Sequence, residues 1–265
     1  LKQLVMGDLG TSLFSGLPVL GEIVSRLPAT IELALFAVTI ASIFGIFLGV
    51  ISAVKQNSIL DNLAQVGGLV GVSMPRFWLG LMIIIAFAVN LKLLPVSGRF
   101  DFMNRPEEIT GFYILDSIIT RNWSALWSTL RYLALPSFTI AVASIGSIMR
   151  YTRSAMLETI RQDYIRTARS KGLTERRVIT RHALKNALIP IVTVIGMQLS
   201  GLFSGSVLTE TIFAWPGVGK YIVDGINNTD YAVVQGGCLL VALISVAMNL
   251  AVDLLYGVLD PRIRY

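Results

Sequence analysis

Five long stretches with few or no charged side chains constrain the fold of this chain more than any other feature. Between Glu32 and Lys55, for example, 22 consecutive residues carry no charge. A helix needs about 20 mainly apolar residues to cross the hydrocarbon core of a bilayer, and it must pair its backbone polar groups internally. The stretches therefore predict an all-α, polytopic membrane protein. The five predicted spans are residues 28–54, 62–91, 132–156, 186–209 and 231–258.

The amino-acid composition argues against a soluble domain. Apolar residues make up 54% of the 265 residues and charged residues only 14%, whereas a soluble domain carries about 25% charged residues. The formal net charge of +6 does not indicate nucleic-acid binding, because the basic residues lie between apolar runs. Cys238 and His182 are the only residues of their types, so we expect no metal site, no disulfide and no catalytic residue.

The distribution of basic residues predicts which segments face the cytoplasm. Three segments on one side, among them 150–185 and the tail from Asp260, hold 13 Lys and Arg residues, and the segments on the other side hold eight. Residues 157–185 are therefore predicted to be cytoplasmic and residues 1–27 external. Five spans with a cytoplasmic tail, and a first residue that is Leu1 rather than Met, lead us to expect a sixth, N-terminal helix in the native protein.

The segment from Arg150 to Lys185 combines many basic residues with interrupted apolar stripes. Helix-forming residues dominate it, and Gly172 is its strongest break, so the pattern predicts two short amphipathic helices that meet there. Two interpretations are open: a solvated loop that lies on anionic lipid, or a segment that docks into a groove on another protein. Ala168 and Gly172 favour docking, because small residues allow close approach.

The residues around Gly172 resemble a motif of one transporter family. Arg166-Thr167-Ala168, three further residues and Gly172 are similar to the EAA loop of binding-protein-dependent ABC importer permeases. Arg166 and Thr167 stand where that motif has Glu and Ala, and the stretch to Pro190 is longer than in sugar-type permeases. Both departures resemble the dipeptide, oligopeptide and nickel branch, in which the phrases DYIRTARxKG and HALxNAxxP recur.

Further phrases along the whole chain resemble the same branch, most closely the B-type permease of dipeptide importers. The resemblance implies a single transmembrane permease domain, residues 1–265, with the fold of type I ABC importer permeases in the cell membrane of a prokaryote. It also implies transport of dipeptides or oligopeptides, with nickel chelates and glutathione as alternatives. The phrases begin at Gly7, Ser73, Leu94, Thr209, Trp215, Asp230 and Asp260.

The same resemblance implies several partners. They are a second homologous permease subunit, two cytoplasmic ATPase subunits, an external solute-binding protein and membrane lipid. ATP and Mg²⁺ would be bound by the ATPase subunits, so this chain is expected to hold no cofactor and not to be an enzyme. Its phrase from Gly217 to Lys220 lacks the upstream glycine of a phosphate-binding loop.

In such a transporter the EAA-like segment couples ATPase motion to the spans by alternating access. Its small residues would allow close approach, its apolar residues Ile165 and Leu173 would anchor the partner, and its cations would form a polar rim. The predicted coupling residues are Tyr164, Ile165, Thr167, Ala168, Arg169, Lys171, Gly172 and Leu173.

Three polar residues inside the apolar stretches are candidates for the translocation path: Arg76, Asn249 and Asp253. Arg76 follows a proline, and the pair either kinks the second span beside an aqueous cavity or ends a short helix. Asn249 and Asp253 lie one turn apart, and pairing with a neighbouring helix is an equal alternative. Glu32 is interpreted as an acid in the opening turn of the first span, where the helix dipole favours it.

Two other classes of function are open to an all-helical membrane protein. A secondary transporter or channel would work without ATPase partners and would hold more paired charges within its spans. A membrane-embedded enzyme would need a catalytic set inside the spans, and no Ser/His, paired aspartate or HExxH arrangement is visible there. The docking segment favours the ATP-driven importer over both.

Overall fold

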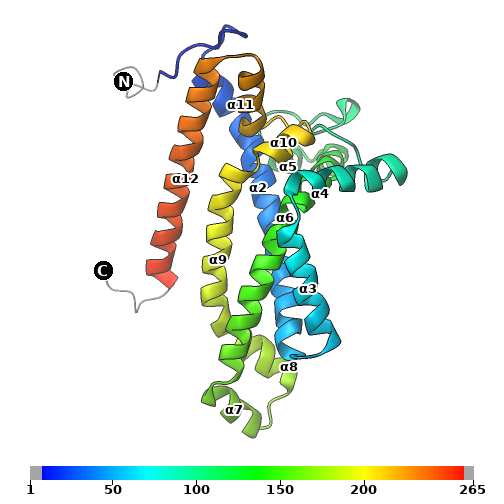
Figure 1. Cartoon of the computed structure of the whole chain (residues 1–265), viewed down its shortest axis with the longest axis vertical. Helices are drawn as coiled ribbons and strands as arrows, with labels where there is room; N and C mark the ends of the chain where they lie inside the picture. Colours follow the sequence, from blue (N-terminus) through cyan, green and yellow to red (C-terminus); the bar gives the residue numbers. More distant parts are fainter. Residues whose placement is uncertain (1–7, 260–265) are drawn as a thin grey trace. The chain divides into compact units, whose positions relative to one another are not determined.

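The computed structural model describes the backbone of residues 8–259, and the side chains of this range except at 203–205, 253 and 255–259. Gly7 and the phrase from Asp260 lie outside the described residues. Within the described part the chain is almost entirely helical (Figure 1). The α-helices are α2 (Val19–Val54), α3 (Ile59–Ser73), α4 (Arg76–Ile83), α5 (Tyr113–Ile119), α6 (Trp123–Ile160), α7 (Asp163–Ser170), α8 (Glu175–Arg177), α9 (Leu184–Gly205), α10 (Val207–Ile212), α11 (Val218–Asn227) and α12 (Tyr231–Leu259).

Three short elements complete the described secondary structure. π-helical stretches continue α4 and precede α9, and a 3₁₀ turn lies in the long loop before α5. Their bounds are Ile84–Asn90, Val178–Ala183 and Phe102–Asn104, respectively.

Among the described residues, four helical segments are long and apolar enough to cross a bilayer: α2, α6, the segment from Glu175 through α9, and α12. The pair α3 and α4 makes a fifth crossing if it is counted as one span. α2 has 36 residues, which is about 54 Å of helix and well beyond the roughly 30 Å hydrocarbon core. It begins at Val19 rather than at residue 28, because Val19 and Ile23 are buried in an apolar core and a Glu22–Arg26 ion pair supports this part of the helix.

The second predicted span is not one continuous helix. α3 ends at Ser73, and both Met74 (φ −71°, ψ 132°) and Pro75 (φ −61°, ψ 128°) have extended backbone. A proline disfavours helical geometry in the residue before it and has no N–H to donate. Arg76 is therefore the first residue of a new helix, which agrees with the interpretation in which Pro75 separates two shorter helices.

The contacts divide the chain into two compact units. Unit 1 comprises Leu1–Ala37, Pro75–Ile140 and Gly201–Ala247, and unit 2 comprises Val38–Met74, Ala141–Ser200 and Met248–Tyr265. α2, α6, α9 and α12 each contribute residues to both units. One further boundary, between Met74 and Pro75, coincides with the break between α3 and α4.

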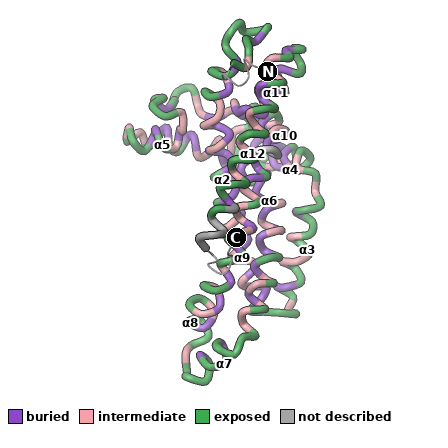
Figure 2. Tube along the Cα trace, turned by 90° about the vertical axis from the view of Figure 1, so that its left-hand side faces the viewer, coloured by how far each residue is buried: buried purple, intermediate pink, exposed green. Residues whose placement is uncertain are grey.

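Exposed residues recur along the long helices (Figure 2), and many of them have large apolar side chains. In α2 and α12, for example, Ile43, Phe47, Leu243 and Val246 are between 60% and 66% exposed. A soluble protein rarely leaves so much contiguous apolar surface uncovered. In a bilayer, lipid tails or a neighbouring subunit cover such side chains.

In unit 2, α2 packs closely against α6 because a glycine stands at their contact. A Cβ atom on Gly49 would lie 2.5 Å from the Cβ of Thr152 and 2.7 Å from the carbonyl oxygen of Met149. The absence of a side chain thus lets the two helix backbones approach, as small residues do at helix contacts in membranes.

This contact gives a stability prediction with a matched control. We expect Gly49→Ala to lower the thermal unfolding temperature of the detergent-solubilised chain, because forcing a methyl group into a packed site costs about 1–3 kcal/mol. Gly67→Ala places the same methyl group in α3, where no atom lies within 4 Å, so its unfolding temperature should stay the same or rise. Equal shifts for both variants would contradict the close packing at Gly49.

Candidate coupling region

α7 is a short helix with one buried and one exposed face. Asp163 in its first turn and Arg169 in its last turn complement the helix dipole. Ile165 and Ala168 are its buried residues, with 0% and 7% of their surface exposed. Their three-residue spacing places both on the same face of the helix. In Figure 1, α7 lies just beyond the end of α6, from which the chain reaches it through a short turn.

The buried face of α7 packs into the apolar core of unit 2, and Leu173 packs against the same core. Ile165, Ala168 and Leu173 therefore contact their own chain, although the sequence analysis assigned them to the interface with a partner. An amphipathic stripe does not reveal whether its apolar face meets its own chain or another one. Other buried members of this core are Met156, Val178, Ala183, Ala187 and Ile191.

Gly172 closes α7 with a Schellman motif. The amide of Leu173 donates to the carbonyl of Ala168 at 3.4 Å, and the amide of Gly172 donates to the carbonyl of Arg169 at 2.9 Å. This pattern needs a left-handed residue after the helix, and Gly172 has φ +76°. Apart from the two adjoining residues, no described atom lies within 4 Å of a Cβ built at Gly172, so the glycine is required here by the turn.

The outward face of α7 is polar and exposed. Tyr164, Thr167, Arg169 and Lys171 are all exposed, and Gly172 lies beside them. The amide Nδ2 of Asn186 in α9 donates to the hydroxyl of Tyr164 at 2.8 Å, and Arg169 forms an ion pair with Glu175 across the turn at 2.7 Å. Of the predicted coupling residues, these five form the surface available to a partner.

An ion pair between the half-buried Arg153 and the buried Asp61 ties α6 to α3, ten residues before α7 begins. Arg153 donates from Nε and Nη2 to the two carboxylate oxygens of Asp61, each at 2.8 Å. The Ser52 hydroxyl, the Asn57 amide and the Gln65 side chain donate to the same carboxylate. Sequence reasoning missed this pair, because the two residues are 92 positions apart and only three-dimensional contact connects them.

Breaking this pair should destabilise unit 2 strongly. Arg153→Met leaves the buried Asp61 carboxylate without its counter-charge, which typically costs about 3–5 kcal/mol. A large fall in the thermal unfolding temperature of the purified chain is the expected result. Arg169→Met removes the exposed pair with Glu175 and should cost less than about 1 kcal/mol. Adding Asp61→Asn to Arg153→Met should recover part of the loss, and a double variant no better than Arg153→Met would contradict the pairing.

The turn at Gly172 gives a second prediction. A side chain with a Cβ in the left-handed region costs about 1–2 kcal/mol, and asparagine tolerates that region better than alanine. Hydrogen exchange of the α7 amides should therefore be fastest in Gly172→Ala, intermediate in Gly172→Asn and slowest in the unchanged chain. Equal exchange in the alanine and asparagine variants would show that the turn does not depend on this backbone geometry.

The three candidate path residues fall in different places. Arg76 is half-buried at the start of α4 in unit 1. Asn249 in α12 accepts a hydrogen bond from the hydroxyl of Ser200 at 2.6 Å, within unit 2. The backbone of Asp253 belongs to α12, but its side chain lies outside the described residues. The hydrogen bond to Ser200 ties Asn249 to the neighbouring helix α9.

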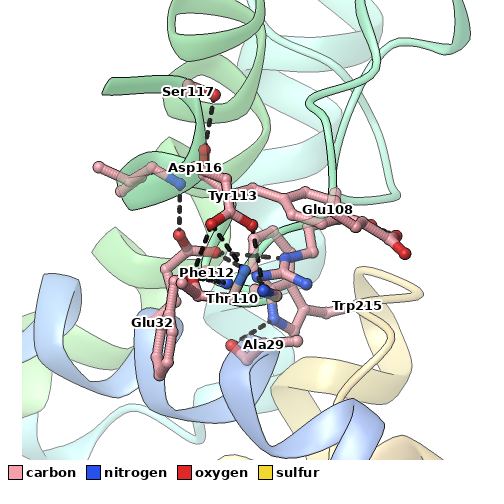
Figure 3. A network of polar contacts seen from close by, with 12 residues as sticks. Ala29, Glu32, Glu108, Thr110, Phe112, Tyr113, Asp116, Ser117 and Trp215 are labelled. Atoms are coloured by element: carbon pink, nitrogen blue, oxygen red, sulfur yellow. Dashed lines mark hydrogen bonds and ion pairs between the residues drawn. The ribbon is translucent and has the colours of Figure 1, made fainter. Parts of the chain in front are cut away.

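Glu32 lies well inside α2 and not in an opening turn, so the helix-dipole interpretation was wrong. In unit 1 its carboxylate accepts from Nη2 of Arg99 at 2.7 Å and from the amide of Ile114 at 2.8 Å (Figure 3). The Arg99 guanidinium also lies 3.8 Å from the ring centre of Tyr113. Glu32 thereby holds the loop between α4 and α6 against α2.

The hydrogen bonds of Glu210 give a structural role to part of the sequence phrase that begins at Thr209. This carboxyl group is fully buried in unit 1 and accepts from the hydroxyls of Thr30 and Ser206 and from the amide of Lys220, at 2.9–3.0 Å. Burial raises the pKa of Glu210, and the three hydrogen bonds oppose that rise. The Trp215 indole donates to the carbonyl of Ala29 at 2.9 Å. Both residues fix the segment after α10 to α2.

The chain belongs to the family of binding-protein-dependent transport system inner membrane components, whose family model matches residues 45–265. It is accordingly a permease, the membrane-embedded, multi-pass subunit of a transporter with several subunits. The resemblance inferred from the EAA-like segment is confirmed at the level of the family.

Individual relatives are similar over nearly the whole chain. The dipeptide transport system permease protein DppB of Alkalihalophilus pseudofirmus is 49% identical over 265 residues, which cover 100% of this chain and 80% of the relative. The di/tripeptide permease DppB of Pseudomonas aeruginosa is 47% identical, over 99% of this chain and 78% of the relative. The oligopeptide permease AppB of Bacillus subtilis is 40% identical, over 100% and 78%.

Solved structures share the fold at low sequence identity. A structure of the MetNI methionine ABC transporter in an inward-facing conformation matches with a TM-score of 0.66 at 15% identity, covering 88% of this chain and 93% of that one. A structure of an amino acid ABC transporter with histidines matches with a TM-score of 0.62 at 12% identity, covering 89% and 94%. The predicted type I ABC importer permease fold is thereby confirmed.

Proposed function

We propose that this chain is the channel-forming subunit of an ATP-driven importer of dipeptides and short oligopeptides. The observation that carries the proposal is the match, at 40–49% identity over essentially the whole chain, to permeases named for dipeptide, di/tripeptide and oligopeptide transport. Nickel chelates and glutathione are the alternative solutes. The chain is not expected to hydrolyse ATP itself.

In this proposal α7 receives the motion of a cytoplasmic ATPase. Its exposed residues face the ATPase, and Ile165 and Ala168 tie the same helix to the core of unit 2. A force on the outward face therefore acts on α6 and α9 through packed side chains rather than through a free loop. Closure of the ATPase pair on ATP would move these helices and alternate access to the path, near which we place Arg76, Asn249 and Asp253.

The complete importer would contain a second homologous permease subunit, two ATPase subunits that bind ATP and Mg²⁺, and an external solute-binding protein. Lipid surrounds the exposed apolar side chains of the spans, and no nucleic acid takes part. Domain limits follow the sequence analysis: residues 157–185 form the cytoplasmic coupling region and residues 1–27 the external segment.

Reconstitution into vesicles with the partner subunits tests this function. Uptake of a radiolabelled dipeptide should require ATP and the solute-binding protein. Uptake that continues without ATP would contradict the proposal and indicate a secondary transporter or channel. ATP-dependent uptake of a nickel chelate or of glutathione in place of the dipeptide would retain the ATP-driven class and change the solute.

A pair of lysine variants tests the coupling surface. Lys171→Glu reverses a charge on the outward face beside α7 and should slow ATP-dependent uptake about tenfold, which corresponds to about 1.4 kcal/mol. Lys55→Glu makes the same change on another exposed lysine predicted to face the cytoplasm, and its uptake should be unchanged. The unfolding temperature of both variants should match the parent. Equal uptake by the two variants would remove Lys171 from the coupling surface.

A further inference from the structure

The loop before α2 is a tight, internally braced turn. Ser12 lies at its centre: its amide donates to the carbonyl of Leu17 at 2.9 Å, and its hydroxyl accepts from the amides of Phe14 and Ser15 at 3.2 and 3.0 Å. The same hydroxyl donates to the buried carboxylate of Asp230 at 2.6 Å. This hydrogen bond helps to hold the pKa of Asp230 below its usual value. The loop is thus held in one conformation against the start of α12.

This braced loop displays apolar side chains. Leu13 and Phe14 are 79% and 78% exposed, and Leu17 is 50% exposed. Exposure of single apolar residues is ordinary, but here three of them stand on six residues that hydrogen bonds fix in place. Rigid, exposed aromatic and aliphatic side chains are typical of protein–protein contact sites, where they bind at a low cost in conformational entropy.

A pocket of about 370 Å³ opens beside the loop within unit 1, and Phe14 forms part of its wall. Its lining includes three carboxylates, Glu22, Asp224 and Asp230, and one guanidinium, Arg26. Glu22 pairs with Arg26 at 2.7 Å and Asp224 pairs with Lys220 at 2.5 Å, which leaves the charge of Asp230 in excess. This acidic excess favours a cationic group from a partner.

We propose that the loop Ser12–Leu17 and this acidic pocket form the docking site for the external solute-binding protein, which presents an apolar hollow to Leu13 and Phe14 and a Lys or Arg side chain to the pocket. The inference rests on the proposed function, and it adds a location and a chemistry to the contact. Residues 1–27 and the segment before α12 are on the side that the basic-residue distribution assigns to the exterior. The acidic rim favours a protein over a membrane surface, because anionic lipid headgroups would be repelled.

The test measures binding of the solute-binding protein to the assembled transporter in nanodiscs. The unchanged transporter must first bind this protein and import a dipeptide with it; failure at that stage would reject the proposed function itself. Leu13→Ser/Phe14→Ser should then weaken binding at least tenfold and leave the basal ATPase rate unchanged. Phe102→Ser/Met103→Ser alters an equally exposed apolar pair on another loop and should bind normally.

Charge variants at Asn228 test the pocket separately. This exposed residue lines the pocket at the end of α11. Asn228→Lys should weaken binding and Asn228→Glu should keep or strengthen it, with both differences shrinking as salt is added.

Normal binding by both the Leu13/Phe14 and the Asn228→Lys variants would overturn the proposal. Loss of binding confined to the Phe102/Met103 variant would also overturn it, and would assign docking to that loop. Normal binding together with quenching of a fluorophore at position 14 by lipid-borne quenchers would overturn it in favour of the bilayer.

Discussion

Hydrocarbon is a solvent in which an unpaired backbone group or charge is very costly, and most features of this chain follow from that constraint. Wherever the side chains are apolar, the backbone N–H and C=O groups pair with one another within a helix. The buried carboxylates are each surrounded by donors: Asp61 by Arg153 and three further groups, Glu32 by Arg99 and an amide, and Glu210 by two hydroxyls and an amide. These contacts join segments far apart in the sequence and hold the elements of each unit together.

The coupling region differs from a free loop that folds onto its partner. Because Ile165 and Ala168 are buried in the core of unit 2 and Gly172 terminates the helix, α7 is already ordered before any partner binds. A partner therefore does not have to supply the entropy of ordering it. The residues that α7 leaves exposed are the polar ones.

The sequence predicted well what depends on local pattern and poorly what depends on contact between distant residues. Uncharged runs predicted the apolar helices, Pro75 marked the break between α3 and α4, and Gly172 marked the end of α7. The start of α2 at Val19 was missed, because the core that buries Val19 and Ile23 is formed with residues far along the chain. The direction in which Ile165 faces, and the Arg153–Asp61 and Arg99–Glu32 pairs, could not be predicted, since a hydrophobic stripe or a lone charge does not name its partner.

The two faces of α7 tolerate different amino-acid substitutions, and this difference determines which of its side chains can be exchanged between related permeases. Residues on the inner face must preserve volume, because they complete a packed core. Residues on the outer face fill no core, and the contacts they make within the chain are polar, such as the Arg169–Glu175 pair. Exchanging the exposed side chains of α7 between related permeases should therefore change the surface of this helix without repacking the core of unit 2.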